Sequence, residues 1–190
     1  MAGRESRRVT ILEAASQLFM ERGFHATTVR QIAQAVGCTE AALYYHFKGG
    51  KRDLLQHVIE AAELDLRSAI TELEQATSLD DLAQRYGAAV ANMQGGRIHR
   101  TIRWITYEMP TFTPEERRPF YNALLNFQRD LTRVVMCFVS DPDDASKIAW
   151  LMLCTSFGFR QIFFDLELGS LVQVDVRTLF RLLSNAFVPT

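Results

Sequence analysis

The sequence predicts an all-α fold with an N-terminal three-helix helix-turn-helix head and a C-terminal helical body, about nine helices in all. Hydrophobic residues make up 48% of the 190 residues and charged residues 23%, proportions typical of a chain that buries a core. Ten glycines and five prolines are few for a turn-rich β fold. Apolar residues recur three and four positions apart along most of the chain, which is the period of one helix face.

The first two predicted helices lie close together near the N-terminus. One covers residues 7–22, where apolar side chains repeat with helical period before Gly23. The other runs from residue 28 to about residue 35. Thr28 and Gln31 have the spacing of a capping box, in which each side chain accepts a hydrogen bond from the other residue's backbone amide.

A tight turn and a third short helix follow. Gly37 suits a turn that needs a positive φ. Thr39 can cap a helix whose first residue, Glu40, favours the positive end of the helix dipole, and Gly49 and Gly50 end this helix. Two helices joined by such a turn place the second one in the major groove of DNA. Residues 1–52 are therefore predicted to form a helix-turn-helix DNA-binding domain.

Residues 53–190 are predicted to form a second, helical domain that takes part in dimerisation. The helix over residues 142–168 is apolar on two opposite sides in its middle, so both sides need a cover, and a second subunit is expected to supply one of them. This helix is expected to end at Gly169. The six helices expected from the end of the head onward cover approximately residues 51–74, 78–94, 97–108, 113–138, 142–168 and 175–187.

Charge is unevenly distributed along the chain. Residues 1–52 hold eight Lys and Arg against four Glu, whereas the net charge of the whole chain is −1. A basic head on an acidic body favours contact between the head and a polyanion. A solvated surface can carry the same imbalance without a partner.

Composition also indicates the compartment. The longest uncharged apolar stretch, from Ile148 to Phe159, is shorter than the ~20 residues of a membrane-spanning helix, and no secretory signal is expected at the start. Three widely spaced cysteines suit reduced thiols better than a disulfide framework. We therefore expect a cytoplasmic protein with no membrane partner. The cysteines are Cys38, Cys137 and Cys154.

Many positions of residues 7–55 match one known pattern. The matching residues are Ile11-Leu12, Ala14-Ala15, Leu18-Phe19, Gly23-Phe24, Thr27-Thr28-Val29, Ile32-Ala33, Ala35-Val36-Gly37, Leu43-Tyr44-Tyr45-His46-Phe47, Lys51 and Leu54-Leu55. This set resembles the DNA-binding head of the TetR/AcrR family of bacterial transcriptional regulators. Cys38 departs from the usual Val or Ile, and Lys48-Gly49-Gly50 is one residue longer than the commonest form. The rest of the chain matches no motif, as is typical of this family's bodies.

The resemblance and side-chain chemistry together indicate which residues meet DNA. Phosphate contacts, which fix register, are expected from Thr28, Tyr45, His46 and Lys51. Base contacts in the major groove are expected from Arg30, Glu40, Ala41, Ala42 and Tyr44. Packing is the alternative for Tyr44, helix capping for Glu40, and a plain helix end for His46.

The resemblance also implies a ligand pocket in the body. Soft apolar side chains with a few polar neighbours suit an aromatic or lipophilic small molecule, although each residue singly could simply fill the core. The candidate ligand-binding residues are Met93, His99, Arg103, Trp104, Tyr107, Phe120, Phe127, Trp150, Cys154 and Phe157. No cofactor and no metal site is expected, because no metal-ligand spacing and no convergent catalytic set occurs.

The family resemblance implies a ligand-responsive homodimer, most often a repressor released from a palindromic operator. Two reading helices roughly 34–36 Å apart would meet successive major grooves. One alternative is a helical ligand-binding or scaffold protein that has lost specific DNA binding, and another is a small helical enzyme. The residues expected at the dimer interface are Leu151, Phe159, Ile162, Leu179, Leu183 and Phe187.

Overall fold

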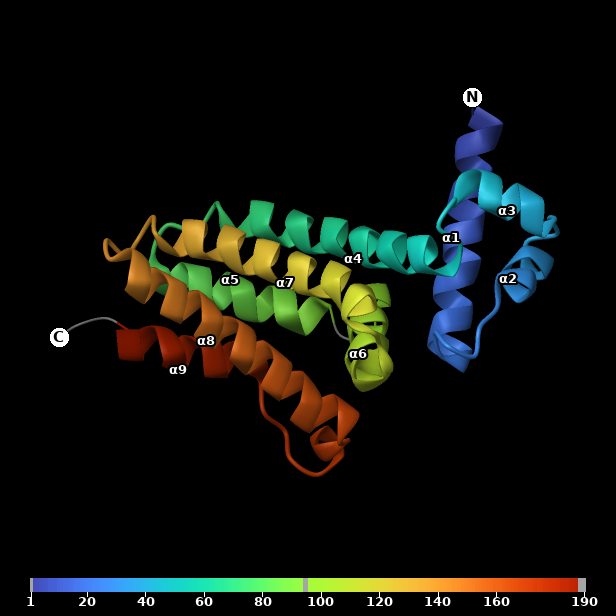
Figure 1. Cartoon of the computed structure of the whole chain (residues 1–190). Helices are drawn as coiled ribbons and strands as arrows, with labels where there is room; N and C mark the ends of the chain where they lie inside the picture. The colour runs from blue at the N-terminus through green and yellow to red at the C-terminus, as the bar shows by residue number, and fades with distance from the viewer. Residues whose placement is uncertain (1, 94–95, 188–190) are drawn as a thin grey trace. The chain divides into compact units, whose positions relative to one another are not determined.

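Every regular element in residues 2–93 and 96–187, which are the residues that the structure describes, is a helix (Figure 1). The coordinates are a computed structural model, and the side chains of residues 2–5, 65 and 185–187 are not described. The predicted all-α fold is confirmed. The α-helices of the described residues are α1 (Ala2–Arg22), α2 (Val29–Ala35), α3 (Glu40–His46), α4 (Lys51–Leu73), α5 (Leu79–Asn92), α6 (Arg97–Glu108), α7 (Pro114–Val135), α8 (Pro142–Arg160) and α9 (Val176–Phe187).

Polar caps explain where several of these helices begin. Ser78 Oγ accepts a hydrogen bond from the Asp81 amide at the start of α5, and the Asp141 carboxylate accepts two at the start of α8. At the start of α7, Thr113 and Glu116 form a capping box, in which each side chain accepts from the other residue's amide. These local bonds satisfy amides that lack a partner within their own helix.

The end of α8 differs from the prediction. The α-helix stops at Arg160 and continues as a π-helical turn, Gln161–Asp165, before the chain turns. The left-handed residue is Glu167, with φ of 56°, and not Gly169. Gly169 is needed for a close approach instead, since a Cβ there would lie 2.8 Å from the carbonyl oxygen of Phe163.

The chain forms two compact units. We call Met1–Leu64 with Arg97–Ala123 the head unit, and Asp65–Gly96 with Leu124–Thr190 the body unit. The helices α4 and α7 each contribute residues to both units. This packing division differs from the functional division at residue 52/53, which remains a prediction.

The head unit has an apolar core shared by α1 to α4, α6 and the start of α7. Its fully buried side chains include Phe19, Ile32 and Leu43 from the first three helices. From the later segment, Trp104 stacks on Phe19 with ring centroids 5.6 Å apart, and Phe112 lies edge-on to Phe24 at 5.5 Å. Helix α1 and the turn after it therefore pack on residues that follow them by more than eighty positions.

The body unit is built around the close pairing of α5 and α9. Gly87 permits this approach, because a Cβ there would lie 3.0 Å from the Cα of Arg177. The phenol of Tyr86 is buried, lies edge-on to Phe180 and shares a hydrogen bond of 3.2 Å with Ser156 Oγ. Burial raises the pKa of Tyr86 to about 12, so this phenol stays protonated inside the core.

Within the part of the chain that the structure describes, no helix has the length and apolar character needed to cross a lipid bilayer.

Candidate nucleic-acid interface

Local hydrogen bonds fix the start of α2 and of α3. Thr28 Oγ1 accepts from the Gln31 amide at 3.2 Å, and Gln31 Oε1 accepts from the Thr28 amide at 2.8 Å. The capping box predicted for this segment is thereby confirmed. Thr39 Oγ1 caps α3 by accepting from the Ala42 amide at 3.1 Å, and Gly37 between the two helices has φ of +65°. A side chain with a Cβ would be strained in that turn.

Burial divides the short helix α3 into an inner and an outer side. Leu43 is fully buried and faces Ile32 and Ala33 of α2, which are also buried. The small side chain of Ala33 suits the close approach of the two helices, and its carbonyl accepts from the Cys38 amide at 2.9 Å. Leu43 therefore fixes the helix on the head unit, and exposed side chains remain on the opposite side of the helix.

The outer side of α3 contains the residues predicted to contact DNA. Glu40 and Ala41 are exposed, Tyr44 is 46% exposed and Tyr45 is 61% exposed, whereas Ala42 and His46 are half-buried. At the start of α2, Thr28 and Arg30 are exposed as well. Two half-exposed aromatic rings on a seven-residue helix present a large contact area to a partner.

Tyr44 has a packing role besides its exposure. Its ring lies against the backbone of Gly50, where an added Cβ would meet the ring at 3.0 Å. Gly50 also has φ of +61°, so a glycine is required there for two reasons. Gly50, in the lengthened segment before Lys51, thus makes room for the tyrosine ring.

Lys51 has internal partners that sequence reasoning missed. Its ammonium group donates to the carbonyl oxygens of Phe24 at 2.9 Å and of His25 at 3.3 Å, and lies 4.5 Å from the centre of the Phe24 ring. Burial lowers the pKa of Lys51, against the opposing attraction of Glu116 and Glu108. Lys51 therefore holds the turn between α1 and α2 at the start of α4. Two of its three N–H donors are used in this way, and the third remains for the predicted phosphate contact.

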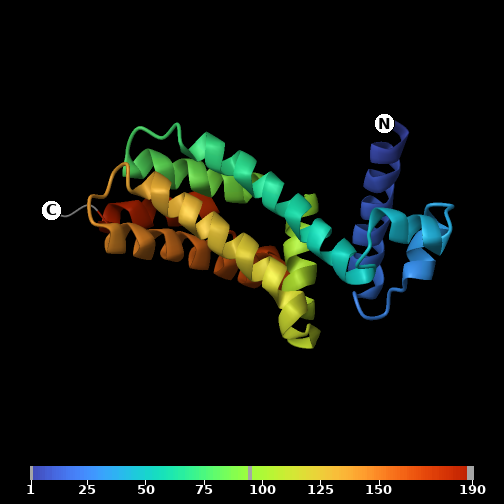
Figure 2. The same cartoon turned by 45° about the horizontal axis from the view of Figure 1, so that its top comes forward.

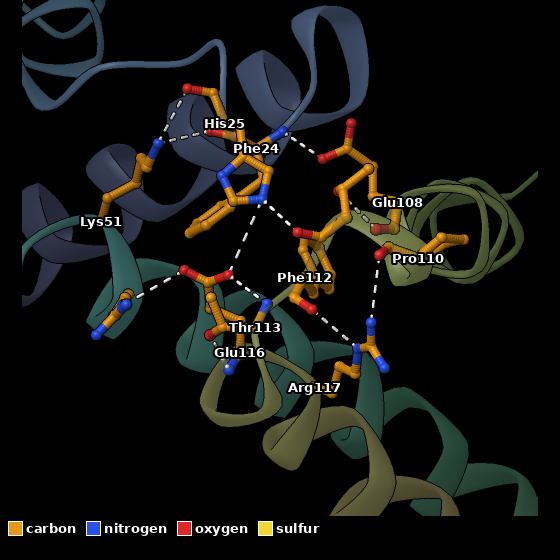
Figure 3. Close-up of polar contacts among 11 residues, drawn as sticks. Phe24, His25, Lys51, Glu108, Pro110, Phe112, Thr113, Glu116 and Arg117 are labelled. Carbon is orange, nitrogen blue, oxygen red and sulfur yellow. Dashed lines mark hydrogen bonds and ion pairs between the residues drawn. The ribbon is translucent and has the colours of Figure 1, made fainter.

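Carboxylates from the later segment of the head unit bind the same turn (Figure 3). The carboxylate of Glu108, at the end of α6, accepts from the Phe24 amide at 2.7 Å. A side chain at Gly23 would collide with this carboxylate, since a Cβ there would lie 2.5 Å from Glu108 Oε1. Together with Lys51, these contacts hold the α1–α2 turn against α6.

Glu116 holds the start of α4 in a similar way. Its side chain is only 6% exposed and accepts from Arg52 Nε at 3.3 Å, and it lies 3.9 Å from His25 Nε2 (Figure 3). Burial opposes ionisation, but the Thr113 amide, Arg52 and His25 together outweigh it and lower the pKa of Glu116. We call the contacts of Lys51, Glu108 and Glu116 the polar junction.

The ten residues predicted to bind a small molecule are divided between the two units. In the head unit, Trp104 is buried against Phe19, whereas Tyr107 is 83% exposed. In the body unit, Phe127 is buried in the core, whereas Trp150 and Cys154 lie on the exposed side of α8. Of the others, Arg103 is exposed and Met93, His99, Phe120 and Phe157 are half-buried.

The residues predicted at a dimer interface differ among themselves in exposure. Leu151 and Ile162 are 39% and 43% exposed, as an interface requires. Phe159 is only 6% exposed and stacks on Phe163 with centroids 4.7 Å apart, so it belongs to the core of the body unit. The side chain of Phe187 lies outside the described residues. Half-buried Leu179 and Leu183 pack against the core, and the exposed residues that the sequence did not single out include Leu182.

Comparison with known proteins identifies the head. Residues 11–58 match the family model of bacterial regulatory proteins of the tetR family. The repressor KstR2 of Rhodococcus jostii is 38% identical over 82 residues, which are 43% of this chain and 39% of that protein. The activator FasR of Mycolicibacterium smegmatis is 36% identical over 87 residues, which are 46% of this chain and 38% of that protein.

The fold of the chain extends the likeness beyond the head. The structure of GusR from Salmonella enterica matches with a TM-score of 0.75 at 23% identity, over 95% of this chain and 94% of that one. The sequence match spans only about two fifths of the length of the two curated relatives. Residues 11–58 are therefore identified as a segment of the tetR family of bacterial regulatory proteins, and the likeness of the rest of the chain to solved structures is one of fold.

Proposed function

We propose that this protein is a homodimeric, cytoplasmic transcriptional regulator that binds a palindromic DNA site through α2 and α3. The observation that carries the proposal is the outer side of α3, where exposed residues stand on a helix fixed from behind by Leu43. The family match to residues 11–58 supports the same role. The relatives named as KstR2 are repressors, which favours repression here.

Each exposed residue has a chemical role in this proposal. Thr28, Tyr45, His46 and the remaining N–H group of Lys51 bind phosphates and fix the register. Arg30 can bind a guanine with both arms of its guanidinium group, and Glu40 can accept from a cytosine amine. Ala41 and Ala42 can contact thymine methyl groups, and Tyr44 adds contact area beside them.

The dimer forms through α8 and α9 in this proposal. Leu151 and Ile162 supply exposed apolar surface on α8 and just beyond it, and exposed Trp150 extends that surface. Leu182, 59% exposed, supplies it on α9. A two-fold axis through this surface would pair two reading helices with successive major grooves, roughly 34–36 Å apart.

A small molecule bound by the chain releases the DNA to the extent that it favours a conformation unfit for the two grooves. The polar junction supports a route for this effect, because Glu108 joins the end of α6 to the α1–α2 turn and Glu116 joins α7 to α4. An aromatic or lipophilic ligand with one hydrogen-bond acceptor suits Trp104 in the head unit, since its buried Nε1 has no hydrogen-bond partner among the described residues.

Selection from a random-sequence DNA pool tests the proposal. The wild-type protein and an Arg30→Ala/Tyr44→Ala variant are compared at near-physiological salt, with light scattering as a check on the dimer. We expect a palindrome that is enriched by the wild type and lost with the variant. Absence of enrichment with a folded dimer, also after refolding away any bound small molecule, would contradict the proposal.

A further inference from the structure

The first turns of α1 carry arginines to which the proposed function assigns no role. Arg7 and Arg8 are exposed and precede Ile11, the first fully buried residue of the head-unit core. In both views the N-terminal turns of α1 continue past α3 along the axis of α1 (Figures 1 and 2). Arg7 and Arg8 belong to α1 and so lie outside α2 and α3 themselves.

Arg7 lies beside the junction of α2 and α3. Its Nη1 donates to the carbonyl oxygen of Val36 at 3.2 Å, and Val36 is the residue that ends α2. A guanidinium group has five N–H donors, so this bond leaves donors for a partner. The contact fixes the stem of Arg7 while its head stays exposed.

Arg8 lies beside the other end of the reading helix. Its guanidinium carbon is 5.1 Å from the ring centre of Phe47, the buried residue that directly follows α3. Tyr45 and His46, which we propose as phosphate contacts, immediately precede Phe47 in sequence. The ring thus holds an exposed positive charge next to the phosphate-binding end of α3.

We propose that Arg7 and Arg8 bind the phosphate backbone of the duplex just outside the base pairs that α3 reads. This inference rests on the proposed function and adds a second contact region to it. Arginine is suited to the role, because its planar fork matches a phosphate with two parallel hydrogen bonds. The charge of this segment also favours DNA phosphates as the partner, since residues 1–52 hold eight Lys and Arg against four Glu.

Salt dependence of binding to the selected duplex is the test, because a packing role alone would not change it. Arg8→Gln and the Arg7→Gln/Arg8→Gln double variant are compared with the wild type between 50 and 200 mM salt. Log K falls with log salt, and each lost phosphate contact should make this negative slope less steep by about 0.9. The fall in affinity over that range should then be about three- to four-fold smaller per contact.

Two control variants separate charge from packing. Arg22→Gln removes an exposed charge at the opposite end of the same helix, about 21 Å along its axis from Arg8, and should leave the slope unchanged. Arg8→Lys keeps the charge and should restore the wild-type slope. On a duplex shortened to the selected palindrome, wild type and double variant should bind alike.

The inference is overturned if Arg8→Gln and the double variant keep the wild-type slope, or if Arg22→Gln lowers it equally. It is also overturned if Arg8→Lys and Arg8→Gln weaken binding alike at an unchanged slope, which would mean packing on Phe47. A wild-type protein that selects no duplex contradicts the proposed function, and this inference with it.

Discussion

At the scale of single residues, Lys51 has partners beyond its expected role. The sequence predicts a phosphate contact, and the structure adds two carbonyl oxygens and the face of Phe24 as partners of the ammonium group. The partners lie 26 and 27 positions earlier in the chain, and a single sequence contains no signal for such a contact. The lysine could be singled out from its charge and position in the sequence, but its carbonyl partners are visible only in the folded structure.

Lys51→Met should therefore lower stability as well as DNA affinity. The methionine keeps most of the apolar stem but leaves two carbonyl oxygens without the ammonium donor, so we expect a loss of about 1–2 kcal/mol in unfolding free energy. Urea denaturation measures this loss. A variant as stable as the wild type would show that the two bonds contribute nothing to folding.

Glu116 should make the stability of the head unit depend on pH. Its pKa is lowered in the folded state, so ionised Glu116 stabilises the fold above the unfolded pKa of about 4.3. This contribution is lost as the pH falls through the folded pKa. Glu116→Gln should therefore have a lower melting temperature than the wild type at pH 7, and the difference between the two melting temperatures should decrease towards pH 3.5. A difference of the same size at both pH values would contradict the ionic role.

At the scale of elements, the starts of capped helices were predictable, whereas some ends, and the start of α1 at Ala2 instead of residue 7, were not. The caps at Thr28, Thr39 and Thr113 lie within four residues of their partners, so the local sequence contains the whole signal. The end of α8 depends on contacts further away. Gly169 is explained by its approach to Phe163, and a residue with a side chain, Glu167, adopts the left-handed conformation.

Helix α6 packs in the core of the head unit through Trp104. Removing this side chain should therefore lower the free energy of unfolding. Trp104 is 7% exposed and stacks on Phe19, so Trp104→Ala should lower the unfolding free energy by about 3–5 kcal/mol. Tyr107→Ala is the matched control on the same helix, since Tyr107 is 83% exposed and should change stability little. Equal effects of the two changes in denaturant would contradict the shared core.

At the scale of the whole molecule, the sequence predicted the fold class better than it predicted which surfaces of the body are exposed. Apolar pattern alone cannot separate the inner from the outer side of α8, because both sides are apolar. Phe159 is consequently buried where an interface was expected, and Trp150 is exposed where a pocket was expected. The ligand and dimer assignments remain predictions for this reason.

The exposed apolar surface of α8 and α9 predicts the state of association. The wild type should have twice the mass of the 21.7 kDa chain by light scattering at micromolar concentration. Leu151→Glu/Leu182→Glu should give a folded monomer, because the charges would be buried without partners at the interface. Tyr107→Glu, an exposed control on α6, should remain dimeric. A monomeric wild type would contradict the two-fold arrangement.

The measurement that tests the central claim most directly is the specificity ratio, the affinity for the selected duplex divided by that for a scrambled one at fixed salt. We expect a ratio of at least about 10³ for the wild type. In Arg30→Ala/Tyr44→Ala the ratio should fall by about ten-fold or more, while affinity for the scrambled duplex stays the same. A wild-type ratio near one, or an equal ratio in both proteins, would contradict sequence reading by the α2–α3 surface.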